Sequence, residues 1–176
     1  DVVVYNRTGA KAEVWVKEHG GRAASTPREA AMGADQIFAC VGNDDDVRSV
    51  VLGADGALAG MSPGAVFVDH TTASAALARE LYARAREQGL HFIDAPVSGG
   101  QAGAINGVLT VMCGGDASAY DRAEKVIAAY ARMCKLLGNS GSGQLAKMVN
   151  QICIAGLVQG LSEGIHFAKK AGLDIE

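Results

Sequence analysis

Short apolar runs alternate with longer helix-like segments along most of the chain. The runs are continuous rather than alternating in polarity, which is typical of strands covered on both faces of a sheet. They predict strands at residues 2–5, 22–24, 36–41, 65–68, 90–93, 109–113 and 133–137, the second of them weak. Helices are predicted at residues 11–19, 27–31, 44–52, 74–88 and 117–130. This order predicts an α/β fold with a mostly parallel sheet.

The pattern changes from residue 143 to about residue 171, where there is no proline and no strand pattern. Apolar residues occur around almost the whole circumference of this segment, which predicts one long, largely buried helix that begins a second, helical domain. Glycines recur every fourth residue at Gly156, Gly160 and Gly164. We expect this groove to allow close approach of another helix, within a helical domain or across a dimer. A membrane dimerisation motif is less favoured because the apolar length is too short.

Composition narrows the class of protein. Apolar residues make up 49% and charged residues 20% of the chain, the balance of a globular protein with a core. A net charge of -3 without a Lys/Arg cluster argues against nucleic acid as a partner. No segment is long and apolar enough to span a bilayer, and the chain runs from Asp1 directly into a strand without a signal peptide. We therefore expect neither a membrane protein nor a secreted one.

The four cysteines are Cys40, Cys113, Cys134 and Cys153. They lack C-x-x-C spacing, and each lies within an apolar run, so the sequence favours small buried hydrophobic side chains over a disulfide or metal set. Such usage is typical of a reducing compartment, and we expect the protein to be cytoplasmic and to hold no metal.

Ligands of open parallel sheets bind beyond the carboxyl ends of the strands. Asn6, Arg7 and Thr8 follow the first strand, where an arginine can pair with the 2′-phosphate of NADP; a solvated turn is the alternative. Val41 and Gly42 follow the third strand, and the segment 69–72, which includes Thr72, follows the fourth. Both suit a cofactor or anion at a helix start, although each is also consistent with a plain N-cap. His70 is expected beside the site or in solvent rather than in catalysis.

Two further segments carry candidate chemistry. Ser98, Gly99 and Gly100 leave the backbone bare, so N–H groups and a hydroxyl can converge on a carboxylate; a simple turn is equally consistent. A glycine-rich loop, residues 138–143, opens the long helix, and it is not a Walker loop because no Ser or Thr follows Lys147. Lys147, Asn150 and Gln151 share one helix face. Burial of Lys147 in an apolar turn would lower its pKa toward the range useful for proton transfer.

Four segments together, VYNRT, VDHTT, FIDAPVSGGQAGAINGVLTVMCGG and GNSGSGQLAKMVNQ, resemble the β-hydroxyacid dehydrogenase family, which includes 3-hydroxyisobutyrate dehydrogenase and tartronate semialdehyde reductase. The resemblance covers essentially the whole chain. It implies a Rossmann-type domain over residues 1–138, then an interdomain helix and the start of an all-α dimerisation domain over residues 139–176. A homodimer or homotetramer through the helical domain is the implied assembly.

The resemblance also implies roles for individual residues. Lys147 would be the catalytic general acid/base, and Ser98, Gly99 and Gly100 would hold the carboxylate of a small substrate. Val41 and Gly42 would lie beside the cofactor, and Thr72 near its nicotinamide end. The implied reaction transfers a hydride between NADP, or alternatively NAD, and a small 3-hydroxyacid or its semialdehyde.

The chain departs from the family pattern at two places. Many members have K-x-x-x-N, with an asparagine that orients the substrate, whereas this chain has Gln151 at that position, preceded by Asn150. The family also begins with a strand and a G-x-G-x-x-G loop, whereas this sequence begins one βα unit later and stops in or just after the long helix. We therefore expect a sheet that lacks its first βα unit, and an isolated chain of 176 residues that is inactive.

Three alternatives are weighed against this interpretation. A 6-phosphogluconate dehydrogenase is disfavoured because the histidine beside its catalytic lysine is missing, and an imine reductase because the lysine is retained. A non-catalytic binding or assembly module that keeps the dehydrogenase fold is the remaining alternative. Retention of Lys147 with Ser98, Gly99 and Gly100 argues against it.

Overall fold

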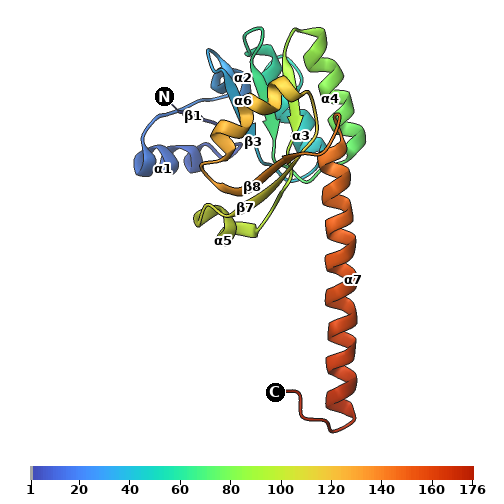
Figure 1. Cartoon of the computed structure of the whole chain (residues 1–176). Helices are drawn as coiled ribbons and strands as arrows, with labels where there is room; N and C mark the ends of the chain where they lie inside the picture. Colours follow the sequence, from blue (N-terminus) through green and yellow to red (C-terminus); the bar gives the residue numbers. More distant parts are fainter. Residues whose placement is uncertain (1) are drawn as a thin grey trace.

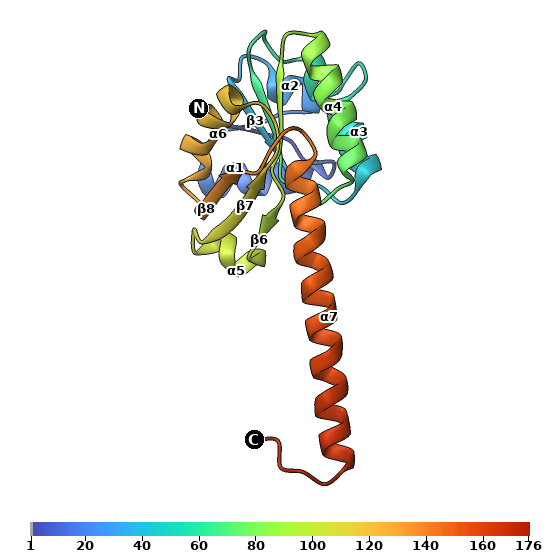
Figure 2. The same cartoon turned by 45° about the vertical axis from the view of Figure 1, so that its right-hand side comes forward.

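The computed structural model describes residues 2–176, so the predicted start at Asp1 lies outside the described residues. Strands and helices alternate through a globular body, from which one long helix projects (Figures 1 and 2). The elements in chain order are β1 (Val3–Val4), α1 (Gly9–His19), β2 (Arg22–Ala23), α2 (Pro27–Ala31), β3 (Gln36–Ala39), α3 (Asp44–Val51), the 3-10 helix η1 (Ala57–Ala59), β4 (Val66–Asp69), α4 (Ala75–Glu87), β5 (His91–Asp94), β6 (Val97–Ser98), α5 (Gly100–Ile105), β7 (Leu109–Cys113), α6 (Ala117–Ile127), β8 (Ala131–Leu136) and α7 (Ser142–Lys170).

Parallel pairing dominates the sheets, as the sequence predicts. The strands β3, β4 and β5 form one parallel sheet, and β7 and β8 pair in parallel in a second one, to which β6 adds an antiparallel edge. The backbones of Asp94 and Gly114 exchange two hydrogen bonds of 3.1 and 2.8 Å, which join β5 to the end of β7. The short parallel pair β1–β2 stands apart as a sheet of its own. The α/β Rossmann-like class is therefore confirmed.

Both faces of the central sheet are covered, which explains why its strands are continuously apolar. Alternate side chains of β4 enter two different cores: Phe67 packs with helices α3 and α4, whereas Val66 and Val68 pack with α6. Phe67 also stacks on Phe92 of β5, with ring centroids 5.8 Å apart. On α4, Leu77 belongs to the same core and is fully buried. This arrangement leaves only the strand ends and the connecting loops for chemistry.

The first predicted strand differs from expectation. Continuous apolar residues predicted burial on both faces, yet Val2 is 53% exposed, and Val3 and Val4 are only half-buried. The reason is that β1 pairs with β2 alone and covers no deep core. Other differences are small: α6 ends at Ile127 rather than at residue 130, and the sequence did not predict η1, β6 or α5.

Helix α7 is long, as predicted, but it is not buried. Among its 29 residues only Gly143, Gln144 and Lys147 are buried, and the helix leaves the body after its first turns (Figures 1 and 2). Large apolar side chains such as Ile152 (72% exposed) and Leu157 (70% exposed) face solvent, because nothing within residues 2–176 packs against them. The groove of Gly156, Gly160 and Gly164 is open: no atom lies within 4 Å of a Cβ placed at any of the three. The described helices include none with the length and apolarity that crossing a membrane requires.

The prediction that all four cysteines are buried is wrong for two of them. Cys40 and Cys153 are exposed, because β3 ends before Cys40 and because α7 is uncovered where it carries Cys153. Cys113 is buried and Cys134 is half-buried on the adjacent strands β7 and β8, with their sulfur atoms 3.6 Å apart. All four thiols are free.

Candidate functional site: strand ends and the start of the long helix

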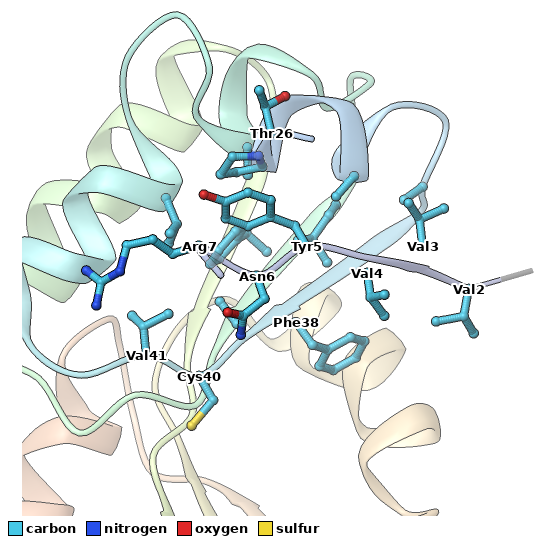
Figure 3. Close-up of a pocket in the computed structure, with 18 of the residues that line it drawn as sticks. Val2, Val3, Val4, Tyr5, Asn6, Arg7, Thr26, Phe38, Cys40 and Val41 are labelled. Carbon is cyan, nitrogen blue, oxygen red and sulfur yellow. The ribbon is translucent and has the colours of Figure 1, made fainter. Parts of the chain in front are cut away.

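A cleft of about 1470 Å³ lies between β1 and β3, and it is called the β1–β3 cleft below. Figure 3 shows Val4 on one strand and Phe38 on the other, both with side chains turned into the space between them. The predicted cofactor residues Asn6, Arg7, Thr8, Val41 and Gly42 all line this cleft. Each of β1 and β3 pairs with only one other strand, so both present an unpaired edge on this side. The structure therefore brings five of the six predicted cofactor residues to one place.

The mouth of the cleft is built from the loop after β1 and the start of α3. Asn6 Oδ1 accepts a hydrogen bond of 2.9 Å from the backbone N–H of Thr8, which shapes the turn that carries Arg7. Arg7 is 84% exposed and donates from Nη1 to Asp46 Oδ1 at 3.0 Å. Gly42 leaves bare backbone beside Asp46, whose Oδ2 would lie 2.5 Å from a Cβ placed there. An exposed guanidinium, free backbone and a helix N-terminus suit a phosphate-bearing cofactor.

The sixth residue, Thr72, is exposed and lies outside the lining of the β1–β3 cleft. Its neighbour Thr71, which the sequence did not single out, is 1% exposed and connects two strand ends. Thr71 Oγ1 accepts from the backbone N–H of Val41 at 2.9 Å, and the Thr71 N–H donates to Asp69 Oδ1 at 2.9 Å. Burial raises the pKa of Asp69 to about 6, against the opposing effect of the hydrogen bonds from Thr71. This junction holds the loop that carries Thr72.

His70 turns away from these strand ends into the sheet. Its Nδ1 lies 2.6 Å from the carbonyl oxygen of Ala95, so Nδ1 carries the proton and donates. Its Nε2, 2.7 Å from the hydroxyl of Tyr130, is then the acceptor. Burial lowers the pKa of His70, which fits this neutral ring. His70 is a structural residue of the core, half-buried rather than in solvent.

Lys147 lies in the second turn of α7 and is only 8% exposed. Within residues 2–176 its amine has no hydrogen-bond or ion-pair partner in the structure. Burial lowers the pKa of Lys147. The side chain of Lys147 is thus largely covered, while its amine keeps access to solvent at the start of α7.

The two other residues of the predicted helix face behave differently from Lys147. Asn150 is half-buried and donates from Nδ2 to Oε1 of Gln151 at 3.1 Å, while Gln151 is exposed. The amide pair is thus accessible one turn beyond the lysine.

The predicted carboxylate loop begins in β6. Ser98 pairs with Thr110 of β7, and the exposed Gly99 and Gly100 have φ angles of +130° and +61°, which favour glycine. Strand β7 also contacts the start of α7, so the loop and Lys147 lie on neighbouring elements (Figure 2).

Sequence reasoning missed the buried polar residues that hold these segments together. They are Asp69, Thr71, Asp94 and Gln144, all buried. Asp69 and Asp94 end two adjacent strands with the patterns FVD and FID, and a carboxylate directly after an apolar strand was the available clue. Nothing in the local sequence distinguishes Thr71 and Gln144 from other polar residues.

Comparison with known proteins decides the family. A profile described as "NAD binding domain of 6-phosphogluconate dehydrogenase" matches residues 1–138, and one described as "NAD-binding of NADP-dependent 3-hydroxyisobutyrate dehydrogenase" matches residues 141–176. The chain belongs to the NAD-binding family of 6-phosphogluconate and 3-hydroxyisobutyrate dehydrogenases. The family resemblance inferred from the motifs is therefore confirmed.

Relatives within this dehydrogenase family match nearly the whole chain. A Shewanella frigidimarina protein described as an uncharacterized oxidoreductase is 63% identical over 99% of the chain and 60% of its own length. An Arabidopsis thaliana protein named probable 3-hydroxyisobutyrate dehydrogenase-like 2, mitochondrial, is 46% identical over 98% of the chain and 57% of its own length. The structure of Mycobacterium tuberculosis 3-hydroxyisobutyrate dehydrogenase with L-serine superposes with a TM-score of 0.88 at 32% identity, over 97% of this chain and 57% of that one. The chain thus spans about 60% of the length of the relatives it matches.

Proposed function

We propose that this chain is part of an NAD(P)-dependent β-hydroxyacid dehydrogenase, an enzyme that interconverts small 3-hydroxyacids and their semialdehydes. The observation that carries the proposal is the position of Lys147: the residue is only 8% exposed, finds no hydrogen-bond or ion-pair partner among residues 2–176, and lies at the start of the helix that packs against β5 and β7 of a dinucleotide-binding fold. Family membership and the relatives named 3-hydroxyisobutyrate dehydrogenase support it. Candidate substrates are 3-hydroxyisobutyrate, tartronate semialdehyde and succinic semialdehyde.

Each part of the site has a role in this reaction. Lys147 takes the hydroxyl proton during oxidation and returns it during reduction, and desolvation lowers the pKa of Lys147 in the direction that favours this exchange. The Ser98 hydroxyl and the bare backbone of Gly99 and Gly100 hold the substrate carboxylate. The Asn150–Gln151 amide pair orients the substrate, with Gln151 in place of the asparagine of other members. The nicotinamide of the cofactor, when bound, supplies or accepts the hydride.

The cleft residues fit the adenosine end of such a cofactor. Gly42 keeps its backbone bare against Asp46, and Arg7 is exposed where a ribose 2′-phosphate would lie, which favours NADP. Asn6 and Thr8 shape the turn around Arg7, Val41 lines the cleft, and Thr72 is assigned to the nicotinamide end. NAD is the alternative, because the Asp46 carboxylate already pairs with Arg7.

Larger-scale features of the whole protein are part of the same proposal. Residues 1–138 are the cofactor-binding part, and residues 139–176 begin a helical dimerisation domain. The unpaired edges of β1 and β3 support a further strand between them, the one carried by a first βα unit, which would leave the strand-end residues Arg7, Val41 and Gly42 for the cofactor. The exposed apolar side chains of α7 support a homodimer or homotetramer formed through the helical part. Four free thiols support a reducing compartment, with the cytoplasm as first choice.

The deciding experiment is a Lys147→Ala substitution in the full-length protein, assayed by NADPH oxidation with succinic semialdehyde, tartronate semialdehyde and glyoxylate. Loss of a general acid/base should reduce kcat by about 10²- to 10⁴-fold. The affinity for NADPH, followed by its fluorescence, should stay the same because Lys147 lies outside the β1–β3 cleft. Lys125→Ala, an exposed lysine on α6, is the matched control and should retain activity.

Turnover that survives Lys147→Ala contradicts the catalytic assignment. Full-length protein that binds neither NADPH nor NADH supports instead the binding or assembly module that keeps the fold without chemistry.

A further inference from the structure

A buried carboxylate accepts hydrogen bonds from the N-terminus of helix α7. Asp94, fully buried at the end of β5, accepts from the backbone N–H of Gly141 at 2.7 Å through Oδ1 and from that of Gln144 at 3.0 Å through Oδ2. These two N–H groups belong to the set that a helix start leaves without partners, and a negative charge there also complements the helix dipole. Asp94 is thereby joined to two residues that lie 47 and 50 positions later in the chain.

The side chain of Gln144 makes the second attachment. It is fully buried, its Oε1 accepts from the backbone N–H of Ala73 at 3.0 Å, and its Nε2 donates to the carbonyl oxygen of Thr71 at 2.7 Å. The loop of residues 71–73 follows β4 and carries Thr72, the residue assigned to the nicotinamide end. Gln144 thus bonds α7 directly to the loop on which the cofactor side of the site is built.

The start of α7 has no room to shift. A Cβ on Gly143 would lie 2.7 Å from the backbone oxygen of Asp94 and would run into the carbonyl of Met112. A Cβ on Gly114 would lie 2.8 Å from the backbone nitrogens of Ser142 and Gly143. The first turn is therefore pressed against β5 and β7 in one position.

Lys147 depends on this attachment because nothing else holds its amine. It has no hydrogen-bond or ion-pair partner within the described chain, residues 2–176, and its four-carbon stem is flexible. It follows Gln144 by three residues, so the two side chains leave the same side of the helix. The position of the amine is then set by where the backbone of α7 is fixed.

We propose that Asp94 and Gln144 form a clasp that positions Lys147 against the loop of residues 71–73, which makes them positioning residues of the reaction. The inference rests on the proposed function for its catalytic consequence. Loosening the clasp displaces the amine from its position beside the strand ends. A displacement of about 1 Å in such a site can reduce the rate about 100-fold without affecting folding.

The test uses full-length protein with Gln144→Leu, which removes both side-chain bonds, and with Gln144→Glu, which keeps the acceptor for the Ala73 N–H. Asp94→Asn probes the other half of the clasp. Arg122→Met is the matched control, because it removes a hydrogen bond from helix α6 to the turn before β4, from Arg122 Nη1 to the carbonyl of Gly64 at 2.6 Å, away from the strand ends of the site. Thermal unfolding of all four variants shows how much stability each has lost.

The first measurement needs no substrate. The protein is labelled with trace acetic anhydride across a range of pH, and mass spectrometry follows the peptide that contains Lys147. In the unaltered protein the pH of half-labelling should lie below the ordinary lysine pKa of 10.5, because burial lowers the pKa of Lys147. In Gln144→Leu it should move toward that value, with Gln144→Glu intermediate and Arg122→Met unchanged.

The second measurement is steady-state kinetics. Gln144→Leu and Asp94→Asn should lower kcat by about 10- to 100-fold while KM for the cofactor changes by less than about threefold. An equal loss of kcat in an Arg122→Met protein of matched stability overturns the proposal, as does unchanged labelling of Lys147 in Gln144→Leu and Asp94→Asn. If Lys147→Ala keeps its activity, the proposed function fails, but the labelling result still decides whether the clasp positions the amine.

Discussion

Asp69 carries a carboxyl group that the fold buries at the end of β4, where it is 2% exposed. Burial raises its pKa from 3.8 to about 6, and the nearby Asp94 and Asp44 carboxylates add to the rise. The folded chain therefore holds this proton more tightly than the unfolded chain does. Its contribution to stability is fully present below pH 3.8 and is lost as the pH rises through 6.

Replacement of Asp69 by asparagine removes this penalty without changing the shape of the side chain. The amide oxygen can still accept from the Thr71 N–H, the bond that is 2.9 Å long. A rise from 3.8 to about 6 corresponds to about 3 kcal/mol of free energy of unfolding at neutral pH. For a chain of this size that amount raises Tm by about 6 to 12 °C.

The assay is urea and thermal unfolding of Asp69→Asn and the unaltered protein at about pH 4 and about pH 7.5. The two should be nearly equal in acid, and the variant should be the more stable one at neutral pH. Asp121→Asn, an exposed position on α6, should show no such pH-dependent difference. A stability difference that is the same at both pH values, or a variant less stable at neutral pH, refutes the reasoning.

Three further predictions follow from the same contacts. Arg7→Ala should weaken NADPH binding about tenfold more than NADH binding in fluorescence titrations, and equal losses contradict the assignment of Arg7 to the 2′-phosphate. In the 176-residue chain, Gly143→Ala should lower the free energy of unfolding in urea by at least about 1–3 kcal/mol because its Cβ meets the Met112 carbonyl, whereas Gly160→Ala, with open space around it, should raise it by up to about 1 kcal/mol. The pKa of His70 is lowered by burial, so the folded state resists protonation, and the protein should lose thermal stability below pH 6.5 relative to His70→Gln; parallel losses in both proteins refute this.

Local patterns predicted most helices and strands, because the spacing of hydrophobic residues indicates which faces of a segment are buried. The continuous apolar strands β4 and β5 are covered on both faces as predicted, and α4 buries its apolar face under the sheet. The same rule failed for α7. Apolar residues around its whole circumference indicate that the helix needs a packing partner, but they do not show that the partner lies within the same stretch of chain. It also failed for β1, whose apolar residues line the β1–β3 cleft instead of a core.

The candidate site was predictable only in part, for a related reason. Lys147 and the Ser98–Gly99–Gly100 run stand out because a lysine in an apolar turn and adjacent glycines are unusual locally. The bonds that place them are non-local: Gln144 reaches its two partners across 71 and 73 positions of the chain. No short stretch of the sequence contains both residues that such a hydrogen bond joins.

The sequence by itself determined most of the order of strands and helices, the parallel sheet, the family, and which residue types carry chemistry. These properties depend on periodicity and on motifs within single segments. The tertiary structure decided that Arg7 pairs with Asp46, that His70 faces the core, and that Asp94 and Gln144 secure the helix of Lys147. These properties depend on which distant groups the packed sheet brings within hydrogen-bond distance, because a buried polar side chain must find its partner wherever the fold places one.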